Sequence, residues 1–184
     1  MKHTHHILVF LLCLSAASCE NAGNGNYAGT DTTATAGNKS ALTNREDNFV
    51  VNTIEANAEE LSLLRASLNT ATDTGLLAHA QQMITDHEQM DMELKSLAAT
   101  KNVDISNADT SIIAQLSEKP GPDWDEEWAD EIGDMHRTLI RRFERAQNFA
   151  KDADLKALID KSLPTLRSHM RMAEQLEERL NKKD

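Results

Sequence analysis

The feature that most constrains the fold of this chain is a helical spacing of apolar residues, which recurs in four long stretches between residues 45 and 182. Apolar positions three and four residues apart indicate amphipathic helices that each bury one face. Aromatic residues make up only 4% of the chain, which argues against a β-sandwich or a β-barrel. The sequence therefore predicts an all-α domain. The first stretch shows the spacing most clearly, with one face made of Val50, Ile54, Asn57, Leu61, Leu64 and Leu68.

Turn and cap residues divide this region into four helices. Thr43 and Glu46 have the spacing of a capping box, which opens the first helix. Asp123 with Glu126 is the predicted cap of the third. Two short turns and one longer connection, with a short helix expected around 111–116, give an antiparallel four-helix bundle. The predicted turns and connection are residues 72–75, 101–122 and 152–154.

The first 18 residues resemble a bacterial lipoprotein signal peptide. Lys2 precedes an apolar run over residues 7–17, and Cys19 follows small residues. Residues 14–19 resemble a lipobox, although Ala16 stands where leucine is usual. Cys19 is then the expected site of lipidation, because Cys13 would leave with the signal peptide and a lone cysteine cannot form an internal disulfide. The alternative is ordinary signal-peptidase cleavage after Ala17 or Ser18.

Residues 19–44 are expected to form a flexible tether between this anchor and the bundle, because they contain almost no large apolar side chain. The predicted organisation is therefore a signal peptide over 1–18, a tether over 19–44 and a bundle over 45–182. The formal net charge of −11 is the wrong sign for binding phosphates, so nucleic acid is not an expected partner. The membrane is an expected partner through the lipid anchor.

Three histidines lie at the centres of predicted apolar stripes, namely His87, His136 and His169. His136 and His169 are equidistant from the turn at 152–154, so an antiparallel hairpin places them at one level. Reflecting His87 through the turn at 72–75 reaches Glu60, which lies about 80° from the centre of its stripe. We expect these four side chains to meet inside the bundle.

Three imidazoles and one carboxylate are suitable ligands for a single divalent transition metal, such as zinc, iron or copper. Asp91, about 40° from the stripe centre and one turn beyond His87, is expected to orient that histidine from outside the ligand set, with Asp86 as a further candidate. The alternative is a polar layer without a metal, whose buried groups satisfy one another.

Short segments on all four predicted helices carry a resemblance to a known family. They are Phe49 with Glu60, the segment from Met83 to His87, Trp124-Asp125-x-x-Trp128 with His136, and Leu163-Pro164-x-Leu166-x-x-His169. These segments resemble a family of bacterial exported proteins, domain of unknown function 4142, over about residues 46–180. The family's usual Phe-Asp-x-x-Tyr motif has tryptophan at both aromatic positions here. The resemblance implies a ferritin-like four-helix fold and a location in the cell envelope, with no established activity.

Di-iron chemistry is not expected, because Ile84, Gly133 and Leu166 stand three residues before the histidines, where that chemistry needs glutamate. No familiar catalytic motif is present either. We therefore expect a lipid-anchored envelope protein, at the outer membrane or in the periplasm, that binds one metal ion without catalysis. One alternative is an interaction or structural module of the envelope, in which the histidine layer only fixes helix packing. Another is a weak metal-dependent oxidoreductase or hydrolase.

Overall fold

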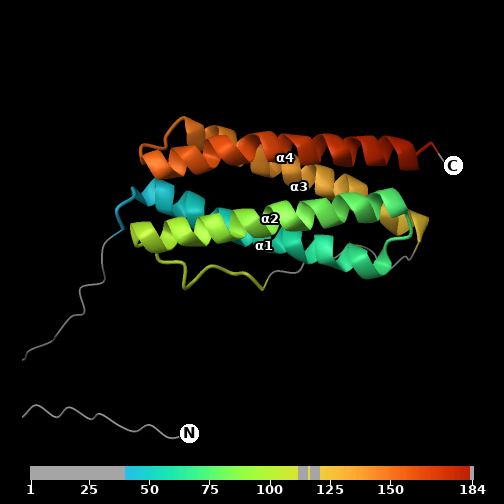
Figure 1. The fold of residues 1–184 in the computed structure, drawn as a ribbon, viewed down its shortest axis with the longest axis horizontal. Helices are drawn as coiled ribbons and strands as arrows, with labels where there is room; N and C mark the ends of the chain where they lie inside the picture. Colours follow the sequence, from blue (N-terminus) through green and yellow to red (C-terminus); the bar gives the residue numbers. More distant parts are fainter. Residues whose placement is uncertain (1–39, 112–115, 117–120, 183–184) are drawn as a thin grey trace, which may run out of the picture. The chain divides into compact units, whose positions relative to one another are not determined.

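The computed structural model describes residues 40–111, 116 and 121–182, and all regular secondary structure in these residues is helical. The predicted all-α four-helix fold is confirmed. The expected signal peptide, Cys19, most of the expected tether and most of the expected short helix at 111–116 lie outside the described residues. The four helices are α1 (Asn44–Thr70), α2 (Thr74–Lys101), α3 (Pro122–Gln147) and α4 (Ala153–Leu180) (Figure 1).

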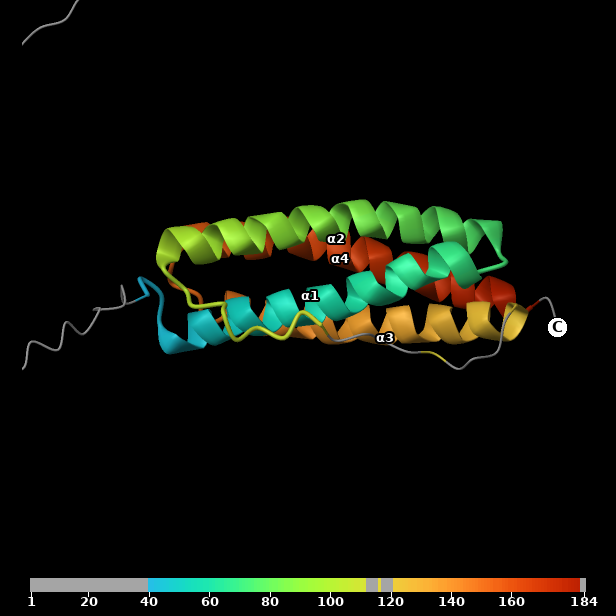
Figure 2. The same ribbon diagram turned by 90° about the horizontal axis from the view of Figure 1, so that it is seen from below.

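The helices form two antiparallel hairpins, α1 with α2 and α3 with α4, which lie side by side (Figures 1 and 2). The second view shows α1 next to α3 and α2 next to α4, so each helix is antiparallel to both of its neighbours. The described part of the long connection runs beside α1, where the Asp109 backbone N–H donates to Glu55 Oε1 at 3.0 Å. Bundles of this kind, with one long crossover, place side chains from all four helices in one interior.

Side-chain caps begin three of the four helices. The capping box of Thr43 and Glu46 is confirmed at α1. Asp73 and Asp152 accept backbone N–H groups at the starts of α2 and α4. The predicted cap of α3 by Asp123 is wrong: the residue before α3 is Gly121, which makes no side-chain cap bond. Its φ of 88° lies in the left-handed region that glycine tolerates, and proline follows at the first helical position.

The buried apolar side chains of the described residues form two clusters, and a polar layer interrupts them at the same level on every helix. One cluster lies around the start of α1 and the end of α2, and the other lies around the turn between these two helices. The histidines therefore lie at mid-height in the bundle. The residues that flank the layer are Ile54 and Leu61 on α1, Ile84 and Met90 on α2, Ile132 and Leu139 on α3, and Leu166 and Ala173 on α4.

Two further features concern the helices as wholes. The helix α4 continues through Pro164, although proline cannot donate a backbone hydrogen bond there. Among the helices described, none combines the length and the apolar character that crossing a bilayer requires.

Candidate metal centre

Four ionisable side chains, one from each helix, fill the polar layer, and each is at most 2% exposed: Glu60, His87, His136 and His169. The three imidazole rings lie with their centroids 5.2–5.3 Å apart. Each ring offers a nitrogen that lies within 4.8 Å of the nitrogens offered by the other two. The structure thus brings together the four residues that the sequence predicted to meet. We call them the histidine layer.

The tautomer of His87 is set by Asn57, one turn before Glu60 on α1. The Asn57 Nδ2 group donates to the main-chain oxygen of His87 at 3.1 Å, which orients the amide. Asn57 Oδ1 then lies 2.8 Å from His87 Nδ1 and is the acceptor for its proton. Consequently the Nε2 atom of a neutral His87 carries a lone pair and faces the other histidines.

The tautomer of His136 is set by its own helix. Its Nδ1 atom lies 3.0 Å from the main-chain oxygen of Ile132, an obligate acceptor, so Nδ1 carries a proton. The Nε2 atoms of His87 and His136 face each other at 3.4 Å. Two lone pairs at that distance repel, so a proton or a metal ion has to lie between them.

His169 is oriented by a carboxylate on the neighbouring helix. Its Nε2 atom lies 3.0 Å from Asp86 Oδ2 and donates to it, and Gln82 Nε2 holds the same oxygen at 2.9 Å. The Nδ1 atom of His169 is buried and has no hydrogen-bond partner. A histidine that binds a metal through one nitrogen commonly donates its other N–H to a carboxylate. The Asp86–His169 pair has this form.

Two predictions about outer residues need correction. Asp91 does not orient His87, because its carboxylate pairs with Lys95 Nζ at 2.7 Å on the surface and Asn57 takes that place. Asp86 does hold a histidine, but the histidine is His169 on α4. Sequence reasoning missed Asn57, although a polar residue in the centre of an apolar stripe was the signal that could have found it.

Glu60 lies beside the three imidazoles without a hydrogen bond of its own at Oε1. This oxygen makes an ion pair with His136 Nδ1 at 2.8 Å and lies 3.6 Å from His87 Nε2, although neither contact has full hydrogen-bond geometry. The Nδ1–H group of His136 thus lies between the Ile132 carbonyl and the Glu60 carboxylate, and its charged form is stabilised by that carboxylate.

Burial and charge act against each other in the layer. Burial raises the pKa of Glu60, but His136 and His87 outweigh it and lower that pKa to about 2. Burial lowers the pKa of His87 to about 4, against the opposing charge of Glu60. Burial also lowers the pKa of His169, whereas for His136 the Glu60 carboxylate outweighs burial and raises the pKa. The layer therefore combines a carboxylate that stays charged, two imidazoles whose neutral form is favoured by burial, and His136, whose charged form is stabilised by Glu60.

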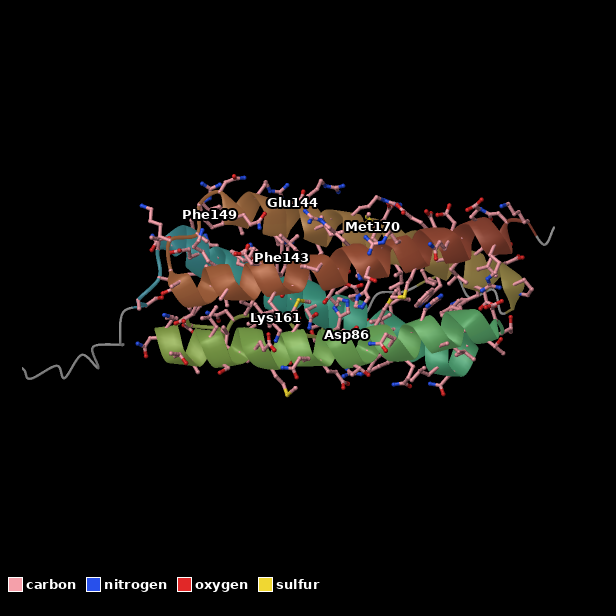
Figure 3. All side chains as sticks on the ribbon, turned by 45° about the horizontal axis from the view of Figure 1, so that its top comes forward. Asp86, Phe143, Glu144, Phe149, Lys161 and Met170 are labelled. Atoms are coloured by element: carbon pink, nitrogen blue, oxygen red, sulfur yellow. The ribbon has the colours of Figure 1, made fainter. Side chains whose placement is uncertain are left out.

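Two clefts reach the histidine layer from opposite pairs of helices. The α2–α4 cleft, about 120 Å³, ends at His87 and His169. Figure 3 labels Asp86 and Lys161 on this side, between α2 and α4. The α1–α3 cleft, about 230 Å³, ends at Glu60. Both clefts lie between the hairpins, so the layer is closed within each hairpin and approachable between them.

The donor set fits a divalent transition metal. Two ligands in a tetrahedral zinc site with bonds of 2.0–2.1 Å lie about 3.4 Å apart, and the Nε2 atoms of His87 and His136 are separated by 3.4 Å. The remaining imidazole nitrogen is within 4.8 Å, so a small ring movement would complete the set. Three imidazole nitrogens that are close together and buried could therefore hold a metal ion.

Comparison with known proteins gives one match. Residues 31–176 match a family described as a domain of unknown function (DUF4142). Comparison with curated proteins and with solved structures gave no match. The matched range contains all four residues of the histidine layer together with Asn57 and Asp86. The chain therefore belongs to the DUF4142 family, and its bundle carries a buried histidine triad that could hold a metal ion.

Proposed function

We propose that this protein binds a single divalent transition metal ion through His87, His136, His169 and Glu60. One observation carries the proposal: each imidazole has one nitrogen next to a separate outer acceptor, which leaves its other nitrogen for the interior. The acceptors are Asn57, the Ile132 carbonyl and Asp86. Such outer acceptors fix the tautomer and orientation of metal-binding histidines in known sites.

The alternative, a layer that only fixes helix packing, is also supported by an observation. If His136 is protonated, its Nε2–H can donate to His87 Nε2 across the 3.4 Å contact, and Glu60 balances the charge. This arrangement satisfies two histidines without a metal. It leaves His169 Nδ1 buried with no partner, an arrangement that costs free energy. A metal ion would satisfy all three rings, so we favour metal binding.

Metal analysis of protein purified without a chelator or a histidine tag tests the proposal. We expect one metal ion per chain, and its loss in the His87→Ala/His136→Ala double variant. His79→Ala, on α2 but outside the layer, is the matched control and should keep the metal. Because ligand binding stabilises only the folded chain, a metal at 100 times its Kd should add about 2.7 kcal/mol to the free energy of unfolding.

The result against metal binding is equally clear. It is wild-type protein that contains no metal and unfolds at the same temperature with and without added zinc, copper or iron. If the double variant does not fold, Glu60→Gln is the substitute, because it keeps the shape of the side chain while removing a charged ligand.

We further propose that lipid on Cys19 anchors the protein in the cell envelope. The basis is the sequence pattern of residues 1–19, and dual or triple acylation suffices for stable anchoring. In cell fractionation, a Cys19→Ser variant should leave the membrane fraction. A variant that stays with the membranes would rule out this anchor.

A further inference from the structure

We infer that the α1–α3 cleft is the route by which a hydrated divalent cation reaches the histidine layer, with Glu60 as its first ligand. This inference rests on the proposed function, since it names the access path to the same site. It assigns a cation-recruiting role to two residues outside the ligand set, Glu59 and Glu131.

The first support is the lining of the cleft. Glu59, Glu131 and Asp134 border it, and the buried carboxylate of Glu60 forms part of its inner wall. Arg142 lines it too, but its guanidinium donates to the main-chain oxygen of Asn52. Asp134 pairs with Arg137, so Glu59 and Glu131 near the surface and Glu60 at depth are the carboxylates that remain to attract a hydrated divalent cation.

The second support is the electrostatic field of this cleft. Burial, and after it the charges of Asp134, Asp130 and Glu59, raise the pKa of Glu131. Nearby negative charges favour the neutral form of a carboxyl group and so raise its pKa. Against the positive charges of Arg142 and Arg137, the four carboxylates of the lining leave an excess of negative charge at this cleft. Such an excess raises the local concentration of cations and their association rate.

The third support is independent of the surface charges. Glu60 is buried, and its Oε1 atom makes an ion pair with His136 but no hydrogen bond of full geometry. A cation arriving through the cleft would meet this carboxylate before it meets the imidazoles. Glu60 in turn lies 2.8 Å from His136 and 3.6 Å from His87, so the ion could pass from the carboxylate to the nitrogens.

The α2–α4 cleft is less suited to a cation. Lys161 lines it and pairs with Glu93 (Figure 3 labels Lys161), so one of its two acids is neutralised by a base. Its other acid, Asp86, is committed to His169 and Gln82. The field of this cleft is therefore weaker than that of the α1–α3 cleft.

Stopped-flow uptake of Co²⁺ by metal-free protein, followed by its visible absorption, tests the route. At low ionic strength the Glu59→Gln/Glu131→Gln variant should take up Co²⁺ about 10-fold more slowly than wild type, with one ion still bound at the end. Raising the salt concentration should slow wild type and leave this variant nearly unchanged.

The control is Glu88→Gln/Glu178→Gln, which removes the same charge from exposed ion pairs on α2 and α4. It should retain the wild-type rate. A Thr165→Trp variant obstructs the α2–α4 cleft, which Thr165 lines, and should also retain it.

Two results would overturn the inference. One is an unchanged rate in Glu59→Gln/Glu131→Gln. The other is slow uptake in Thr165→Trp, which would make the α2–α4 cleft the route. The final absorbance separates a failure of the route from a failure of metal binding, because it measures how much Co²⁺ is bound at the end. Wild-type protein that never develops the Co²⁺ absorption contradicts both the proposed function and this inference.

Discussion

Asn57 orients a histidine of the proposed metal site without being one of its ligands. Its amide contacts both the main-chain oxygen and the Nδ1 atom of His87 and is fully buried. It therefore fixes the position of the ring and the nitrogen that faces the interior. Losing such an outer contact typically lowers metal affinity by 10–100-fold, about 1.4–2.7 kcal/mol.

We predict that Asn57→Leu lowers metal affinity by about 10–100-fold, because His87 Nδ1 loses its acceptor while the branched shape of the side chain is kept. Competition with a coloured chelator measures the change. Asp91→Asn is the control and should bind metal like wild type, since Asp91 contacts Lys95 instead of His87. Equal affinities of Asn57→Leu and wild type would show that the amide does not orient the ring.

Glu46 is a second residue whose role depends on its surroundings. Its Oε1 atom accepts the backbone N–H groups of Lys151 and Asp152, at 2.6 and 3.1 Å, and its Oε2 atom accepts that of Thr43. Burial raises its pKa, but these donors outweigh burial and lower it from 4.5 to about 2. The folded protein thus favours the charged form of Glu46.

The sign of the pH dependence follows from that shift. A carboxyl group with a lowered pKa contributes stability that is complete above its unfolded pKa of 4.5 and is lost as the pH falls towards about 2. We predict that Glu46→Gln lowers the free energy of unfolding by up to about 3 kcal/mol at pH 7. Urea unfolding should show this difference shrinking below pH 4.5. A difference that stays constant down to pH 2 would contradict a charge-dependent role.

At the scale of elements, the two hairpins are joined by a reciprocal pair of buried carboxylates. Glu46 at the start of α1 binds the turn between α3 and α4. Asp125 at the start of α3 binds the turn between α1 and α2, where it accepts the N–H groups of Thr72 and Asp73. Each hairpin therefore holds the turn of the other, at opposite ends of the bundle.

We predict that Asp125→Asn destabilises the bundle by about 2 kcal/mol, because the amide nitrogen faces backbone donors and leaves them unsatisfied. Asp125 also accepts the Thr72 hydroxyl at 2.6 Å, which strengthens the effect. Asp130→Asn, an exposed residue of the same helix, should change stability by less than about 0.5 kcal/mol. Thermal unfolding of the two variants makes the comparison. Equal losses would show that Asp125 acts only as a general surface charge.

For the whole described bundle, the histidine layer separates two apolar clusters. A buried set of charged and polar groups in such a place is weak support for stability, because apolar replacement of similar volume is often neutral or stabilising by 1–4 kcal/mol. Stability alone therefore does not account for the histidine layer.

We therefore predict that replacing all four residues of the layer by leucine gives a bundle at least as stable as metal-free wild type. Its free energy of unfolding should be higher by up to about 4 kcal/mol. The same variant should bind no metal. Urea unfolding and metal analysis measure the two effects. Loss of a cooperative transition would instead support the alternative in which the layer fixes helix packing.

Much of this fold could be predicted from the sequence, because the information is local. The spacing of apolar residues gives the helices, and the Thr43–Glu46 pair gives the start of α1. The height of the four side chains in the bundle followed from the number of residues between each one and its turn, because all α-helices rise by the same distance per residue. For the same reason the sequence predicts His136 and His169 at one level, because both lie the same number of residues from the turn between α3 and α4.

The outer contacts could not be predicted in this way. Asp91 and Asp86 are both within four residues of His87, so spacing alone cannot decide which histidine either one contacts. The choice depends on how α2 is rotated against α1 and α4. That rotation places the Asp86 carboxylate next to His169 and the Asp91 carboxylate next to Lys95.

The sequence by itself determined that four amphipathic helices form and that each carries one ligand-type side chain near its middle, because helical periodicity is a property of neighbouring residues. Only the tertiary structure decided which nitrogen of His87 and of His169 faces the interior, and that the α1–α3 cleft ends at Glu60. The physical reason is that these two tautomers and the cleft depend on acceptors and walls from other helices, whereas His136 has an acceptor in its own helix. Those groups lie 30 to 83 residues away along the chain and meet only when the bundle packs.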